Sequence, residues 1–225
     1  MHNRRSHNGA ILIALLMTMP GIGSVTSVAA REPLRIAASA DEVEPLKTGD
    51  MAPGFTVRTV DDQPFVFDPR NLDSPVVLIT FRGGWCPYCN MHLSELRNVV
   101  PALREKGIAI YFLSGDRPAM LYASLERETR EVIDGLGYTI LSDANIDAAQ
   151  ALGIAFRAAD STVERRESLG QDIEGSSMRN FGVLPVPAVY VIDTEGRIVY
   201  SFVEPDYKVR LPATDLLAAV DALGN

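Results

Sequence analysis

An apolar run that leads through a short turn into a Cys-x-x-Cys pair constrains this chain more than any other feature. Residues 76–81 are Val-Val-Leu-Ile-Thr-Phe, and such a continuous, β-branched run predicts a strand buried on both faces. The turn Arg-Gly-Gly and the segment Trp-Cys-Pro-Tyr-Cys follow, and Cys86 and Cys89 are the only cysteines of the sequence. A helical pattern over 92–103 comes next. The sequence therefore predicts a strand-to-helix junction, typical of an α/β fold, with a thiol at a helix N-terminus.

Residues 1–30 have the layout of a secretory signal. A basic start precedes the uncharged apolar run 10–19, which is too short to span a bilayer as a helix, and small residues follow up to Ala29 and Ala30. We expect a signal peptide cleaved after Ala29 or Ala30, and an exported protein that is periplasmic or extracellular, without stable membrane insertion after cleavage. A membrane anchor that is never cleaved is the alternative.

The rest of the chain, 31–225, has a length that suits one domain with a sizeable core. The sequence carries 21 Lys and Arg against 29 Asp and Glu, a net charge of −8 at pH 7. Residues 1–30 hold two of the arginines and no acid, so the remainder is more acidic still. An acidic chain without basic clusters is not expected to bind nucleic acid.

Hydrophobic periodicity predicts an alternation of strands and helices along the chain. The expected strands are 55–59, 65–67, 76–81, 108–113, 138–141, 188–192 and 197–203, the last two forming a hairpin. The expected helices are 92–103, 118–136, 146–152 and 211–223, and Pro101 should kink the first of them or begin a new segment. Residues 31–50 are interpreted as an extended lead-in. The order predicts one α/β domain with a central mixed β-sheet flanked by helices.

A polar stretch at 157–182 interrupts this alternation and is interpreted as an insertion, partly helical and partly loop. Two roles remain open for it. It is either a solvent-exposed segment on the surface or a lid over the cysteines.

Cys86 and Cys89 are expected to be a redox pair and not a structural disulfide, because closing so small a loop would constrain the unfolded chain very little. Cys86 lies where the N–H groups of the helix converge, so the pKa of its thiol should be lower than that of a free cysteine. Cys89 lies one turn further into the helix. We therefore expect Cys86 to attack and Cys89 to resolve the intermediate. Trp85 would flank this site, or pack as an ordinary core or surface residue.

A metal site at the cysteines is the alternative chemistry. Cys86, Cys89 and His92 share one helical face, and three such ligands could bind copper or zinc. Closed zinc sites usually take four ligands, and no second Cys or His cluster is present to supply a fourth. We therefore expect no metal site, and interpret His92 as a helix-surface residue.

The Trp-Cys-Pro-Tyr-Cys segment between a strand and a helix resembles the thioredoxin superfamily, and the chain is most similar to its AhpC/TSA peroxiredoxin-like branch. The segments that carry this resemblance are 49–55, 81–90, 113–116, 141–143 and 185–188. It implies a thioredoxin fold and a thiol-dependent antioxidant enzyme without an organic cofactor. Such an enzyme reduces hydroperoxides through a Cys86–Cys89 dithiol–disulfide cycle, and thioredoxin or a similar dithiol donor regenerates it. In the superfamily a cis-proline before a strand helps to dock an extended substrate. Pro187 matches it, with Val186 and Trp85 as neighbouring docking residues.

The sequence departs from true peroxiredoxins at the groups that activate the peroxide. Those enzymes carry a Thr or Ser three residues before the peroxidatic cysteine, where this chain has Gly83 or Cys86, depending on which cysteine is peroxidatic. They also use an Arg from a distant strand, at whose start this chain has Pro187. Arg82 is a possible substitute, although an exposed Arg in a salt bridge is the simpler interpretation. Two other functions therefore remain open: an exported protein thiol–disulfide reductase of thioredoxin type, and a metal-binding thioredoxin-fold module.

Overall fold

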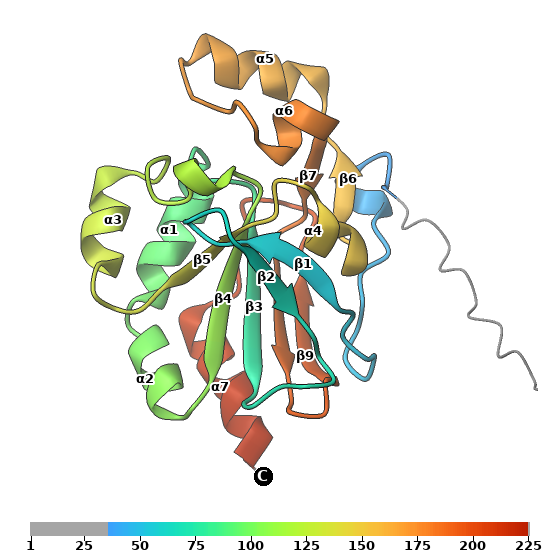
Figure 1. Ribbon diagram of the computed structural model, residues 1–225, viewed down its shortest axis with the longest axis vertical. Helices are drawn as coiled ribbons and strands as arrows, with labels where there is room; N and C mark the ends of the chain where they lie inside the picture. The colour runs from blue at the N-terminus through green and yellow to red at the C-terminus, as the bar shows by residue number, and fades with distance from the viewer. Residues whose placement is uncertain (1–35, 225) are drawn as a thin grey trace, which may run out of the picture. The chain divides into compact units, whose positions relative to one another are not determined.

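A seven-stranded mixed sheet with the strand order β2-β1-β5-β4-β3-β8-β9 organises the protein (Figure 1). The computed structural model describes residues 36–224, so the predicted signal peptide lies outside the described residues. The strands of the main sheet are β1 Phe55–Arg58, β2 Pro64–Phe67, β3 Val76–Phe81, β4 Ala109–Ser114, β5 Thr139–Ser142, β8 Ala188–Ile192 and β9 Ile198–Val203. The helices are α1 Pro87–Leu96, α2 Val100–Glu105, α3 Arg127–Ile133, α4 Asp147–Ala151, α5 Asp160–Ser168, α6 Ser177–Phe181 and α7 Ala213–Asp221. The predicted α/β architecture, a mixed sheet flanked by helices in a thioredoxin-like fold, is confirmed.

Strand β3 is the centre of the core, as its continuous apolar run predicts. All of its residues are buried, and it pairs in parallel with β4 and antiparallel with β8. The neighbouring strand β8 is buried along its whole length as well. Because β3 is covered on both faces and paired on both edges, its carboxyl end is a rigid base for the segment that follows it.

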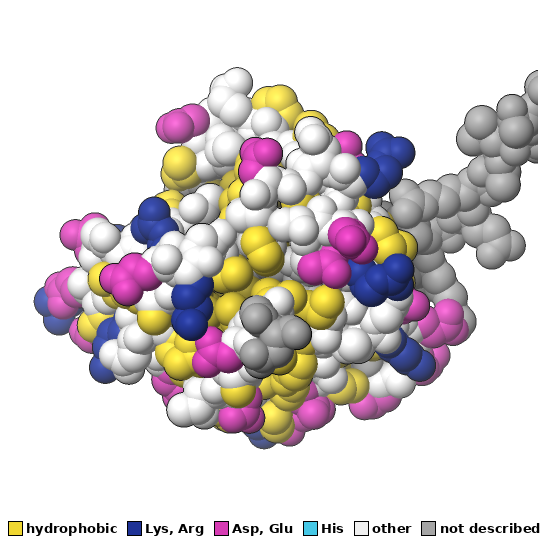
Figure 2. Space-filling model, turned by 90° about the horizontal axis from the view of Figure 1, so that it is seen from below, with side chains coloured by type: hydrophobic (Ala, Val, Ile, Leu, Met, Phe, Trp, Pro, Cys, Tyr) yellow, Lys and Arg dark blue, Asp and Glu magenta, His cyan; other side chains and the backbone are white. Residues whose placement is uncertain are grey.

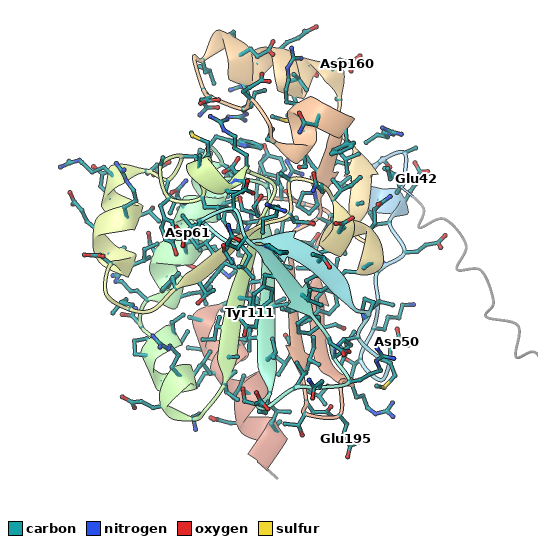
Figure 3. All side chains as sticks on the ribbon, viewed as in Figure 1. Glu42, Asp50, Asp61, Tyr111, Asp160 and Glu195 are labelled. Atoms are coloured by element: carbon teal, nitrogen blue, oxygen red, sulfur yellow. The ribbon has the colours of Figure 1, made fainter. Side chains whose placement is uncertain are left out.

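The predicted hairpins and the predicted break in the first helix are confirmed. Strands β1 and β2 pair antiparallel with Phe55 opposite Phe67, and β8 and β9 pair antiparallel around a turn. Helix α1 ends at Leu96, and α2 begins at Val100 with Pro101 in its first turn, where proline's missing N–H costs nothing. Figure 3 labels Glu195 in the turn between β8 and β9, and Asp160 at the start of α5 on the opposite side of the molecule.

The prediction of one helix over 118–136 is wrong. The segment begins as a short 3-10 turn at Pro118–Met120, and only Arg127–Ile133 is α-helical. The residues between them are bonded to other elements: the Glu126 N–H donates to Asn90 Oδ1 (3.0 Å), and the Tyr122 hydroxyl donates to the Tyr138 carbonyl (2.9 Å). The bond to Asn90 takes the place of a helical bond at Glu126.

The polar insertion is partly helical, as predicted, and contains α5 and α6. Two short strands at its base, β6 Ala155–Arg157 and β7 Val183–Pro185, pair antiparallel and were not predicted. Three-residue strands are too short to show a period. Figure 1 shows α5 and α6 beyond the carboxyl ends of β3 and β4, on the side where α1 begins. The insertion therefore lies at the same end of the sheet as the cysteines.

At the other end of the molecule, the described side chains form no patch of a single charge sign. Figure 2 shows this face, where acidic and basic side chains are scattered among hydrophobic ones. Within residues 36–224, no helix has both the length and the apolar character needed to cross a membrane.

Candidate active site

Cys86 and Cys89 lie together at the start of α1, at the carboxyl end of the central strand. Cys86 is the N-cap residue with an extended backbone, and Pro87 is at the beginning of the first helical turn. The Cys86 carbonyl accepts from the backbone N–H groups of Cys89 (3.0 Å) and Asn90 (3.1 Å). Both cysteines are free thiols and both are buried, with 2% and 1% of their surfaces exposed. The thiols therefore meet a reactant only through a narrow opening or after a local movement.

A buried carboxylate and a buried amide hold the loop before Cys86. Asp116 accepts from the Gly84 N–H (2.8 Å) and from the Ser124 hydroxyl (2.8 Å), and Asn90 Nδ2 donates to the Gly84 carbonyl (2.7 Å). A Cβ at Gly84 would lie 2.6 Å from the Ser124 carbonyl carbon, which no side chain could tolerate without moving the backbone. Glycine is thus needed at position 84 for close packing, and hydrogen bonds fix both the N–H and the carbonyl of Gly84.

The two thiols have very different proton affinities. A hydrogen bond from the Cys89 side chain is the main cause that lowers the pKa of Cys86 to about 6, and the Cys89 N–H, Arg210 and Arg82 add to it. Burial raises the pKa of Cys89 well above its ordinary value, so Cys89 keeps its proton. At neutral pH the pair therefore holds one thiolate, on Cys86, and one neutral thiol beside it.

Arg210 lies in the candidate site, although the sequence did not indicate it. Its Nη2 atom donates to Cys89 Sγ at 3.5 Å, and its Nη1 atom donates to the Val209 carbonyl at 2.8 Å. It reaches the thiols from the segment between β9 and α7, far from them in sequence. The only available signal was an Arg among apolar residues before the last helix, which is weak on its own.

The interpretation of Arg82 as an exposed residue in a salt bridge is wrong. Its guanidinium lies over the Tyr207 ring, with Cζ 4.3 Å from the ring centroid, and over the Phe156 ring at 5.5 Å. Its charge acts on Cys86 and Cys89, and within the described part of the chain it forms no ion pair with a carboxylate. The Tyr207 ring packs against the guanidinium and holds it beside the two thiols.

The interpretation of His92 as a helix-surface residue is also wrong. Only 5% of its surface is exposed, because the segment carrying Arg210 and Leu211 covers this face of α1. Burial, and then the charge of Arg210, lowers the pKa of His92 to about 4, so the imidazole is neutral. Among residues 36–224 no group of three or more His, Cys, Asp or Glu side chains is placed to hold a metal ion, so the geometry gives no support to the metal-binding alternative.

Val186 and Pro187 lie beside the end of β3, where the Thr80 hydroxyl bonds to the Val186 carbonyl. The described residues contain no cis peptide bond, so the predicted cis form of Pro187 is wrong, in line with the general preference of X–Pro bonds for trans. The Val186 N–H donates to the Ile154 carbonyl (2.9 Å), and its carbonyl accepts from the Thr80 hydroxyl (3.0 Å). Both backbone groups are thus already bonded within the protein. Substrate docking at these residues stays a prediction.

Trp85 packs into the site and is covered by the insertion. Only 7% of its surface is exposed; the Arg166 guanidinium lies 4.8 Å above its ring, and Gln171 Nε2 donates to its carbonyl at 3.4 Å. Arg117 holds the same insertion to the body of the protein through a bidentate pair with Asp172 at 3.0 and 2.8 Å. The insertion therefore touches the residue next to Cys86.

A thioredoxin fold that sets a thiolate and a neutral thiol side by side at the start of a helix defines an oxidoreductase that works through thiol–disulfide chemistry. The comparisons with known proteins agree. The chain belongs to the AhpC/TSA family, whose model matches residues 48–201, more than half of its length.

Two curated relatives represent the two chemistries of this class. The chain is 22% identical over 168 residues to "Thiol-disulfide oxidoreductase ResA" of Bacillus thuringiensis (strain Al Hakam), covering 75% of this chain and 76% of the relative. It is 26% identical over 161 residues to "Peroxiredoxin Bcp" of Escherichia coli (strain K12), covering 71% and 87%. Among solved structures, a yeast mitochondrial 1-Cys peroxiredoxin superposes with a TM-score of 0.59 at 19% identity, covering 80% and 76%. That likeness establishes the fold.

Proposed function

We propose that the protein is a peroxiredoxin-like peroxidase in which Cys86 attacks a hydroperoxide and Cys89 resolves the product. The observation that carries this proposal is the unequal pair of thiols: the pKa of Cys86 is lowered to about 6 beside Cys89, and two guanidinium groups act on the same sulfur. A thiolate is the reactive form of cysteine, and fixed positive charge also stabilises the negative charge that develops on a departing oxygen.

The reaction balances with two thiols and one peroxide. The Cys86 thiolate attacks one peroxide oxygen, an S–O bond forms and the O–O bond breaks, and the other oxygen leaves as an alcohol or water after taking a proton. Cys89 then attacks the sulfur of the Cys86 sulfenic acid and loses its proton, and water leaves as the Cys86–Cys89 disulfide forms. Two electrons pass from the thiols to the peroxide, and an external thiol donor returns them by reducing the Cys86–Cys89 disulfide.

Access to the thiols favours a small oxidant. Both cysteines are almost fully buried, and the insertion lies on the adjacent Trp85. Hydrogen peroxide needs little room, whereas a protein disulfide must bring a folded partner to Cys86. In this proposal the insertion is a cover that admits small molecules and hinders large ones, and the pair of Arg117 with Asp172 holds it in place.

A protein thiol–disulfide reductase is the second candidate. The Cys-x-x-Cys pair itself favours it, and so does the similarity to a relative named as a thiol-disulfide oxidoreductase. In that case Cys86 would attack a substrate disulfide and Cys89 would release the mixed disulfide. The chemistry of the pair is the same, so substrate access decides between the two functions.

One kinetic comparison tests the proposed function. The fully reduced protein is mixed with hydrogen peroxide and, separately, with a protein disulfide, and the fluorescence of its single tryptophan next to Cys86 reports oxidation. Peroxide should oxidise the protein about a hundredfold faster than it oxidises a free thiol at the same thiolate concentration, the size of effect that a directed positive group gives. A rate equal to that of the free thiol would exclude the peroxidase.

The same experiment on Arg117→Ala tests the cover. Loss of the tether should raise the rate with the protein disulfide and leave the rate with peroxide unchanged. Arg127→Ala is the matched control, because Arg127 also pairs with acids but on the exposed surface of α3. If the protein disulfide reacts no faster with Arg117→Ala than with the control, the insertion does not restrict access.

We also infer that the protein is exported, from the sequence of residues 1–30 alone. Sequencing of the N-terminus of protein recovered from its native cells should give Ala30 or Arg31 as the first residue. A chain that begins at Met1 would contradict cleavage.

A further inference from the structure

Two guanidinium groups beside the thiols, those of Arg82 and Arg210, form no salt bridge with a carboxylate among residues 36–224. The groups that act most strongly on the charge of Arg82 are Cys86, Cys89, Arg210 and Tyr207, and none of them is a carboxylate. Within residues 36–224 the Arg82 guanidinium forms no hydrogen bond, and its Nε atom and that of Arg210 are buried without an acceptor. In a chain with a net charge of −8, most cations would find an acid nearby. The absence of one at this site needs an explanation.

The charge balance of the site changes with the redox state of the cysteines. In the reduced protein the Cys86 thiolate offsets one of the two positive charges, those of Arg82 and Arg210. In the disulfide there is no thiolate, and both positive charges are left without compensation in half-buried positions. An uncompensated charge away from water attracts a counter-ion. The oxidised protein therefore binds an anion more strongly than the reduced protein does. Since the reductant is the molecule that reacts with the oxidised protein, a reductant that carries a negative charge would benefit from this affinity.

We propose that Arg82, supported by Arg210, forms a subsite for the carboxylate of a small thiol that reduces the Cys86–Cys89 disulfide. This inference rests on the proposed redox cycle and names the chemical class of its electron donor. A carboxylate can accept hydrogen bonds from the Nη groups of Arg82, while the Tyr207 ring holds the guanidinium plane in position. The near-complete burial of both cysteines selects a slim donor over a folded one.

The reduction then runs in two balanced steps. The donor thiolate attacks Cys86 Sγ, the disulfide bond breaks, and Cys89 leaves as a thiolate that takes up a proton. Arg210, whose Nη2 atom lies 3.5 Å from Cys89 Sγ, stabilises this leaving group. A second donor thiolate attacks the donor's sulfur in the mixed disulfide and releases the Cys86 thiolate, which is the better leaving group because of its lower pKa. Two donor thiols become one donor disulfide, and two electrons enter the protein.

The test uses the full-length protein oxidised beforehand with diamide, so that it does not depend on peroxide. Reduction is followed by the fluorescence of Trp85 with three small thiols: 3-mercaptopropionate, which is anionic, 2-mercaptoethanol, which is neutral, and cysteamine, which is cationic. Rates are compared at equal thiolate concentration. The anionic thiol should react about tenfold faster than the neutral one, the preference expected from one charge-assisted hydrogen bond, and the cationic thiol should be slowest. Equal rates for the anionic and neutral thiols would overturn the proposal.

Variants of Arg82 assign the preference to this residue. Arg82→Gln should make the rates with the anionic and neutral thiols equal, and Arg82→Lys should keep part of the preference because it keeps the charge but loses the planar fork. Arg130→Gln is the matched control, since Arg130 is exposed on α3, and it should keep the full preference. A full preference in Arg82→Gln would place the subsite elsewhere and contradict the proposal.

Ionic strength gives a readout that needs no variant. The preference of the unmodified protein for the anionic thiol should shrink as sodium chloride is added, because salt screens a partly exposed charge pair. A preference that does not change with salt would contradict an electrostatic subsite. If the protein is reduced with this preference but peroxide fails to oxidise it, the peroxidase proposal fails while the subsite stands. If peroxide oxidises the protein fast but the reduction shows no preference for the anionic thiol, the subsite proposal fails while the peroxidase proposal stands.

Discussion

Replacing Cys86 by serine should lower the rate of oxidation by hydrogen peroxide by about a thousandfold or more, as the loss of an essential nucleophile does in other enzymes. Cys86 is the only thiol of the pair whose pKa is lowered, to about 6, and a serine hydroxyl forms no anion at neutral pH. The measurement is the peroxide-induced change in Trp85 fluorescence, together with the mass of the product.

The pH dependence of the unmodified protein should identify the same sulfur. The rate with peroxide should rise as the pH increases through about 6 and then level off, because the thiolate is the nucleophile and its fraction follows the pKa of Cys86. Alkylation by iodoacetamide should show the same midpoint and label Cys86 first. A midpoint between pH 8 and 9 would mean that the surroundings of Cys86 do not stabilise the thiolate.

Two variants of Cys89 separate its two roles. Cys89→Ser should keep the fast first step, because a hydroxyl can still donate to the Cys86 sulfur, but oxidation should stop at the sulfenic acid. Cys89→Ala also removes that hydrogen bond, the largest cause of the lowered pKa of Cys86, and the midpoint should move to higher pH. If Cys89→Ser loses the first step while Cys86→Ser keeps it, the roles of the two cysteines are reversed.

The sequence predicted the parts of this site that depend on neighbouring residues. The continuous apolar run of β3 and the proline after Cys86 are local patterns, and they were sufficient to place the two thiols at the start of α1. The parts that depend on distant residues were not predicted. Arg210 is 121 positions from Cys89, and no periodicity links the two.

The wrong predictions have the same origin. Helical spacing alone puts His92 on a surface, and only the tertiary fold shows that the segment before α7 covers it. The pattern over 118–136 is helical by composition, yet the Glu126 N–H is bonded to Asn90 in α1. A local pattern gives the preference of a segment, and side-chain hydrogen bonds from other elements override it.

Asp116→Ala should lower both the stability of the protein and the reactivity of Cys86, although Asp116 touches neither sulfur among the hydrogen bonds of the described residues. The carboxylate is 1% exposed and accepts from the Gly84 N–H and the Ser124 hydroxyl, each at 2.8 Å. Alanine would leave both donors buried without an acceptor. The free energy of unfolding should fall by about 3 kcal/mol, since an unsatisfied buried donor costs roughly 1–3 kcal/mol.

Thermal unfolding measures the first effect, and the melting temperature should fall by roughly 6–12 °C for a domain of this size. Asp116→Asn is the conservative comparison, because its amide oxygen can still accept from the Gly84 N–H. Its melting temperature should fall by less than half as much as that of Asp116→Ala. Asp61→Ala controls for the loss of one acid, since Asp61, which is labelled in Figure 3, is an exposed residue, and it should leave the melting temperature unchanged.

The second effect distinguishes a positioning role from a purely structural one. Gly84 accepts from Asn90 through its carbonyl and donates to Asp116 through its N–H, so the loss of the carboxylate frees one side of the loop that leads into Cys86. The Cys86 thiolate would then be less well aligned with the helix N–H groups and the guanidiniums, and the midpoint of its pH profile should move upward from about 6. At a temperature where Asp116→Ala is still folded, an unchanged midpoint would show that Asp116 contributes to stability alone. A midpoint restored in Asp116→Asn would show that a hydrogen bond to the peptide group two residues before the nucleophile is sufficient to hold the loop, and with it the Cys86 thiolate, in position.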